Sequence, residues 1–257
     1  MAQTLFRAFI LVLAAGLAPT PAFAHFLELI PSANVLPRGG DVTIDMRFTH
    51  PFDGGPVMRL DRPVRFGVMA NGQRIDLTAG LSEPGSPGDG FRAIHRLAEP
   101  GAAIFYVEPT PYYEPAEDRF IVQFTKVIVD SWASGEGWDD VVGLPVEIVP
   151  LTRPTGLWSG NLFQGRVMRA GVPVAAAPVE VEYRNMDGVV APNDAFVTQV
   201  TTTDADGVFT WAMPRAGWWG FAALTEAETG LASPDGREVP VEADAVIWVK
   251  ATAMPAQ

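Results

Sequence analysis

Three histidines, His25, His50 and His95, are the residues in this chain best suited to transition-metal chemistry. The 257 residues contain no cysteine, which excludes disulfides and thiolate metal sites. Imidazole nitrogen binds nickel, copper, zinc and cobalt alike, so the ligand type does not select the metal. All three histidines precede residue 96, and any shared site must therefore lie in the first half of the chain.

The first 24 residues predict a cleavable signal peptide. Arg7 supplies the positive charge, residues 8–17 are apolar, and residues 22–24 read Ala-Phe-Ala before the expected cut. A membrane anchor would need about 20 apolar residues, and Pro19 interrupts a run about half that long. We therefore expect a secreted mature chain, without a transmembrane segment, that begins at His25.

An N-terminal histidine has a chelating group that an internal histidine lacks. Its α-amine and its ring Nδ1 can bind one divalent ion together. The alternative is that a histidine follows the cleavage site by chance. The alternating pattern of residues 42–50 places His50 on the apolar face of a strand, as it does His25 in residues 25–29. The turn-rich segment 37–40 lies midway between the two, so antiparallel pairing would set His25 beside His50.

His95 lies on the apolar face of a predicted strand at residues 91–97. A turn at Pro100 and Gly101 predicts a hairpin with residues 102–108, which would set His95 opposite Tyr106 and near Glu108. Glu108 and His95 are thus both candidates for a third metal donor. The alternative for His95 is a core histidine that hydrogen-bonds Tyr106 or a backbone carbonyl.

Four carboxylates, those of Glu108, Glu114, Glu117 and Asp118, lie within eleven residues of a proline-rich loop. Carboxylates at this density could complete a metal's coordination shell, attract a cation, or orient a ligating imidazole. The alternative is a solvated acidic loop paired with the basic residues that follow it.

The remaining pattern predicts an all-β protein with two tandem β-sandwich domains. Short alternating strands separated by Gly and Pro turns run from residue 25, and Asn71 with Gly72 predicts a tight hairpin within residues 64–77. The alternation lapses over residues 149–160, which suggests domains at 25–155 and 156–257. Residues 165–174, 178–183, 201–210 and 214–224 resemble carboxypeptidase regulatory-like, transthyretin-like modules.

Charge and motif content narrow the function classes. The formal net charge of -12 argues against nucleic-acid binding, which needs clustered Lys and Arg. The sequence contains no Ser-His-Asp triad motif, no glycine-rich phosphate-binding loop and no pair of carboxylates within a recognisable catalytic motif. We therefore expect a protein that is not an enzyme.

Seven motifs resemble those of periplasmic nickel-uptake proteins built on a domain of unknown function. They lie at residues 25–32, 48–52, 108–118, 149–154, 163–165, 191–194 and 216–223. This resemblance implies a periplasmic subunit that binds Ni²⁺ or Co²⁺ beside the membrane subunits of an energy-coupling-factor importer. It also implies a site near the mature N-terminus that includes His25 and His50.

Two other functions remain open. A copper protein or copper-dependent oxidase with a histidine brace would use the same nitrogen donors. A structural or carbohydrate-binding module would need only the tandem sandwiches and their exposed tryptophans.

Overall fold

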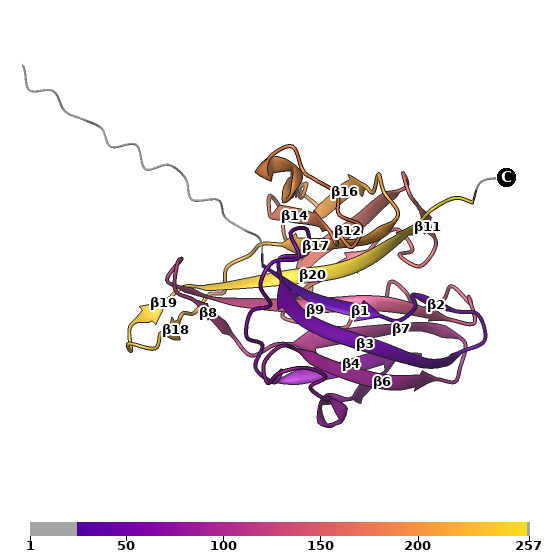
Figure 1. Cartoon of the computed structure of the whole chain (residues 1–257), viewed down its shortest axis with the longest axis horizontal. Coiled ribbons are helices and arrows are strands. Elements are labelled where there is room, and N and C mark those ends of the chain that lie inside the picture. The colour runs from indigo at the N-terminus through magenta and orange to yellow at the C-terminus, as the bar shows by residue number, and fades with distance from the viewer. Residues whose placement is uncertain (1–24, 256–257) are drawn as a thin grey trace, which may run out of the picture.

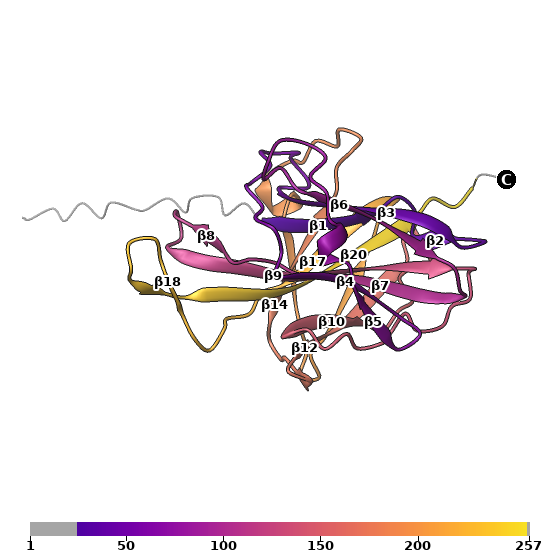
Figure 2. The ribbon, with the colours of Figure 1, turned by 90° about the horizontal axis from the view of Figure 1, so that it is seen from below.

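The computed structural model describes residues 25–255, and the predicted signal peptide lies outside this range. Nearly every element is a strand, and no α-helix occurs between residues 25 and 255. The strands form three stacked layers, with one long sheet between two small ones (Figures 1 and 2). The all-β sandwich class predicted from the sequence is confirmed, and the two sandwiches share their middle sheet.

One outer layer is a three-stranded antiparallel sheet in the order β1-β3-β6. Its strands are β1 (Phe26–Pro31), β3 (Gly40–Thr49) and β6 (Phe91–Leu97). The alternation in β3 buries Val42, Ile44 and Met46 against the middle sheet, as its period-2 pattern predicts.

The middle layer is an eleven-stranded sheet with the order β15-β14-β17-β20-β9-β7-β4-β5. In that order the strands are β15 (Gln199–Thr202), β14 (Pro178–Tyr183), β17 (Gly217–Ala223), β20 (Val241–Thr252), β9 (Arg119–Ser131), β7 (Gly101–Glu108), β4 (Arg65–Ala70) and β5 (Gln73–Asp76). Three short strands pair with the ends of β9 and β20: β2 (Val35–Leu36), β8 (Tyr112–Glu114) and β11 (Leu157–Trp158).

The other outer layer holds β10 (Val146–Pro150), β12 (Leu162–Arg169), β13 (Val172–Pro173) and β16 (Val208–Ala212). A separate ribbon joins β18 (Leu231–Ala232) to β19 (Glu238–Val239), and two 3-10 turns span Thr78–Gly80 and Asp194–Phe196. Within residues 25–255 no helix is long and apolar enough to span a bilayer.

The middle sheet is buried on both faces, which explains the apolar runs in its central strands. In β7, Phe105 and Val107 face the core beneath β1-β3-β6, whereas Ile104 and Tyr106 face the core beneath β10-β12. Strands covered on both faces lose the polar alternation of one-sided strands. Two hydrophobic cores thus lie on opposite sides of one sheet.

The predicted hairpin between residues 91–97 and 102–108 does not form. Strand β6 pairs with β3 in the outer sheet, and β7 pairs with β4 and β9 in the middle sheet. The turn at Pro100 and Gly101 therefore crosses between layers. Local turn chemistry predicts a reversal of direction, but it does not specify which strand becomes the hydrogen-bonding neighbour.

The halves of the chain on either side of residue 155 are joined through the middle sheet. Strand β20 pairs in parallel with β9, from Val241 opposite Phe120 to Trp248 opposite Val127. Strand β10, before residue 155, pairs with β12 after it. The hairpin predicted at Asn71 and Gly72 is confirmed, with both residues at positive φ between β4 and β5.

Candidate metal site

His25 and His50 lie side by side at one end of the outer sheet. Antiparallel pairing of β1 with β3 sets Phe26 opposite Thr49, and the next step outward along both strands brings His25 to His50. The centroids of the two imidazole rings are 4.6 Å apart, with 60° between the ring planes. The adjacency expected from the sequence midpoint is confirmed.

Glu114 reaches this pair from the middle sheet. Strand β8 pairs with the start of β9, with Tyr112 opposite Ile121 and Glu114 opposite Arg119. The Oε2 atom of Glu114 lies 3.6 Å from Nε2 of His25, and the two side chains are only 12% and 16% exposed. This distance is long for a hydrogen bond but close for a charge contact.

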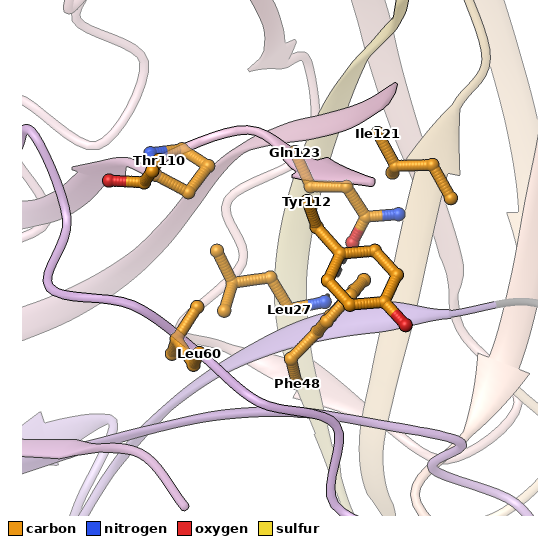
Figure 3. Close-up of a pocket in the computed structure, with 8 residues that line it drawn as sticks. Leu27, Phe48, Leu60, Thr110, Tyr112, Ile121 and Gln123 are labelled. Atoms are coloured by element: carbon orange, nitrogen blue, oxygen red, sulfur yellow. Dashed lines mark hydrogen bonds between the residues drawn. The ribbon is translucent and has the colours of Figure 1, made fainter. Parts of the chain in front are cut away.

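Aromatic rings shield one side of the histidine pair. The His25 ring centroid lies 5.6 Å from that of Phe48 and 6.3 Å from that of Tyr112, and those two rings are 5.1 Å apart. Phe48 and Tyr112 also line a small pocket together with Leu27 and the amide of Gln123 (Figure 3). The histidine pair therefore lies next to an apolar surface formed by Phe48 and Tyr112.

Burial keeps both imidazoles in the form that binds metals. It lowers the pKa of His25 below its ordinary value, and the charge of Glu114 opposes this shift. The pKa of His50 is also lowered, first by burial and then by His25, while Asp53 and Glu114 oppose the change. Lowered pKa values leave both rings neutral near pH 7, with nitrogen lone pairs available.

His95 does not join this pair. It lies opposite Val42 near the start of β3, whereas His50 follows the end of that strand. At about 3.3 Å per residue, this places His95 about 25 Å from the histidine pair. Its ring packs edge-on against Phe105, with centroids 5.9 Å apart, and burial lowers its pKa. The structure therefore separates His95 from the other two.

Glu108 and Tyr106 are also engaged elsewhere. Glu108 accepts a hydrogen bond of 3.0 Å from Nη1 of Arg65, the first residue of β4. Tyr106 lies opposite Gly67 and Lys126 and is buried in the core on the far face of the middle sheet. The predicted contact between His95 and Tyr106 is absent because β6 and β7 belong to different sheets.

The other two loop carboxylates hold the loop to its surroundings. Asp118 accepts hydrogen bonds from Tyr113 and from both terminal nitrogens of Arg237, which lower its pKa. Glu117 lies 3.4 Å from Nε of Arg119. Of the predicted acidic loop residues, only Glu114 has an ion-pair contact with a histidine.

Two residues that the sequence interpretation did not single out also support the site. Gln123 lies within an apolar strand and contacts the backbone of His25, and Asp53 affects the pKa of His50 from the turn after β3. The lone amide among the largely apolar residues 120–124 was the available signal for Gln123. Across residues 25–255, no three His, Asp or Glu side chains form a ready-made metal cluster.

Comparison with solved structures finds distant likenesses. The chain is 13% identical to the D0-D1 domain of intimin and to a two fibronectin type-III domain segment of chicken tenascin. The TM-scores are 0.23 and 0.24, and the match covers 89% of this chain and 100% of each of those chains. The Yersinia pseudotuberculosis adhesin InvE is 13% identical, with a TM-score of 0.23, covering 85% of this chain and 58% of that one.

A search of curated proteins finds no significant match. The profile of a domain of unknown function, DUF4198, matches residues 22–227. This range covers most of the chain, including His25, His50 and Glu114. The protein belongs to the DUF4198 family.

Proposed function

We propose that the mature protein binds a divalent transition metal, Ni²⁺ or Co²⁺, through His25 and His50. In this proposal it is a periplasmic binding protein, and it delivers the ion to the membrane subunits of an importer. The observation that carries the proposal is the contact between two neutral imidazoles, 4.6 Å apart, at the predicted mature N-terminus. The nickel-uptake role and the importer rest on the motif resemblance.

The position of Glu114 favours one binding mode for His25. Its carboxylate faces Nε2 of that ring, at 3.6 Å. A carboxylate on one ring nitrogen favours a proton there and leaves the other nitrogen, Nδ1, as the metal ligand. Nδ1 is also the nitrogen that forms a chelate ring with the α-amine of an N-terminal histidine. Glu114 then orients the imidazole rather than binding the ion.

This donor set needs only two side chains. The α-amine of His25, its Nδ1 and the ring of His50 supply three nitrogen donors once residues 1–24 are removed. Three nitrogens with open positions suit the square-planar or tetragonal geometry of Ni²⁺ and Cu²⁺. No catalytic group is required, because the ion is bound and passed on as cargo.

Titration calorimetry with NiCl₂ tests the chelate directly. We expect the mature protein that begins at His25 to bind one Ni²⁺, and a protein with one extra glycine before His25 to bind far more weakly. His50→Ala should also weaken binding, whereas His95→Ala should not, because His95 is remote from the pair. Equal affinity of the mature and extended proteins would contradict the amine chelate.

Copper is the competing cargo, because a histidine brace offers Cu²⁺ the same three nitrogens and copper binds such sites more tightly in vitro. The metal content of protein purified from its own cells separates the two. Nickel or cobalt at near one ion per chain supports the proposal. Copper, or oxygen-dependent turnover, would replace it with the copper function. A structural module is the other alternative. It would be favoured if the triple variant His25→Ala, His50→Ala, His95→Ala still bound its partner protein as tightly as the unchanged protein does.

A further inference from the structure

We propose that Gln123 is a positioning residue for the metal site. Its buried side-chain amide holds the backbone of His25 in the conformation that binds the ion. This inference rests on the proposed function, since it assigns a role in the same site. Gln123 lies against the edge of β1 that faces the middle sheet.

Among the described strands, β1 pairs only with β3, so its other edge has no strand partner. Unpaired backbone groups on a buried edge are costly. Two side chains of the middle sheet take the place of a strand. Oε1 of Gln123 accepts from the N–H of Leu27 at 2.7 Å, and Nε2 of Gln123 donates to the carbonyl of His25 at 2.7 Å. Nε1 of Trp248 donates to the carbonyl of Leu27 at 3.0 Å.

The amide of Gln123 matches the backbone that it binds. A primary amide has a donor and an acceptor in one plane, as a neighbouring strand would offer. It contacts residues 25 and 27 on either side of Phe26, whose ring packs edge-on against Trp248 with centroids 5.9 Å apart. The Gln123 side chain is 4% exposed, so water does not compete for these bonds.

The backbone groups of Leu27 and His25 fix which way the amide points. Nε2 of Gln123 lies 3.4 Å from Oδ2 of Asp244 as well as near the carbonyl of His25. Asp244 is fully buried, and burial raises its pKa well above the ordinary value. The N–H of Leu27 can only donate and the carbonyl of His25 can only accept, so one orientation of the amide satisfies both. The clamp on His25 therefore has one defined geometry.

The clamp matters because His25 is the predicted chain terminus. Terminal residues fray unless they are held, and a frayed terminus must be ordered each time an ion binds. Pairing with β3 begins at Phe26, the residue after His25, and Gln123 holds the carbonyl of His25 itself. Held in this way, the terminal residue keeps its imidazole beside that of His50 before the ion arrives. The site is then ordered in advance of binding.

Nickel titration of three variants tests this role. Gln123→Met keeps an unbranched side chain and removes both hydrogen bonds, and Gln123→Leu removes both with a branched side chain. Gln164→Met is the matched control, because its amide bonds Thr210 in the opposite outer layer. We expect Kd for Ni²⁺ to rise about 10- to 100-fold in both Gln123 variants and to stay unchanged in the control.

Two further readouts separate positioning from folding. The visible absorption band of bound Ni²⁺ should shift in the Gln123 variants, because the donor geometry changes, and hydrogen exchange at the amide of Leu27 should speed up without metal. Unchanged Kd and absorption band in a folded Gln123 variant would overturn the inference. Should Gln123→Met fail to fold, Gln123→Leu decides the question alone.

The His50→Ala protein distinguishes this inference from the proposed function. Loss of Ni²⁺ binding in His50→Ala together with normal binding in the Gln123 variants would leave the metal site standing and reject the role of Gln123. Normal binding in His50→Ala and in the Gln123 variants would reject both.

Discussion

The backbone N–H of Phe52 donates to Oε2 of Glu182 at 3.3 Å, which ties the turn after His50 to strand β14. The N–H of Asn185 donates to the carbonyl of Pro51 at 3.0 Å and strengthens the same junction. The second half of the chain thus anchors the turn that carries a candidate metal ligand. Because Glu182 is 1% exposed, this anchor is also sensitive to pH.

Glu182 should make the protein less stable as the pH rises. Burial raises its pKa from 4.5 to about 8, so between these values the folded state holds a proton that the unfolded state has lost. Stability therefore falls as pH increases from about 5 to 8. Glu182→Gln removes this dependence, and we expect it to increase the unfolding free energy by about 1–3 kcal/mol at pH 8. Urea denaturation at pH 5 and pH 8 measures the unfolding free energy of the two proteins. If this free energy changed equally with pH in both, the account would be contradicted.

Metal binding should release a proton from the α-amine rather than from the imidazoles. The pKa values of His25 and His50 are lowered by burial, so both rings are already neutral at pH 7. A free α-amine titrates at about 7.7–8, and it must lose its proton to bind. We expect affinity for Ni²⁺ to fall as the pH drops below about 8, and more steeply once the imidazoles also protonate. Calorimetry in buffers of different ionisation enthalpy counts the proton at pH 7; a count of zero would exclude the amine as a ligand.

Glu114→Gln should weaken Ni²⁺ binding about 10-fold without unfolding the protein, because the carboxylate that faces Nε2 of His25 is lost. Glu117→Gln is the matched control, since Glu117 pairs with Arg119 rather than with a histidine. Competition with a chromogenic nickel chelator measures both affinities. An equal effect of the two changes would point to the charge of the loop as a whole and not to orientation of the ring.

Glu147→Ala should destabilise the protein by about 3–5 kcal/mol, because it leaves a buried ammonium group unpaired. Nζ of Lys126 lies 2.9 Å from Oε2 of Glu147, and the two side chains are 1% and 3% exposed. Glu147 also accepts from the backbone N–H groups of Val142 and Gly143. The double variant Lys126→Met, Glu147→Gln removes both charges and should recover part of the loss. Denaturant unfolding of the three proteins tests the pair; a cost below about 1 kcal/mol for Glu147→Ala would show that water reaches Lys126.

The sequence alone determined the strand class and the contact between His25 and His50. Both depend on local features: alternating burial, and one reversal midway between two strands. Period-2 alternation determines the face of the strand on which each histidine lies. Antiparallel pairing then places residues that are equally far from the turn opposite each other.

Only the tertiary structure decided the rest of the site. Local turn chemistry marked the bend near Gly101, yet layer crossing there sends His95 to the far end of β3 and leaves Tyr106 in the other core. Glu114 approaches His25 because β8 pairs with the start of β9. The parallel pairing of β9 with β20 joins segments more than 100 residues apart. Such partners are selected by burial of both faces of one sheet, a collective property of the packed chain that no short stretch of sequence encodes.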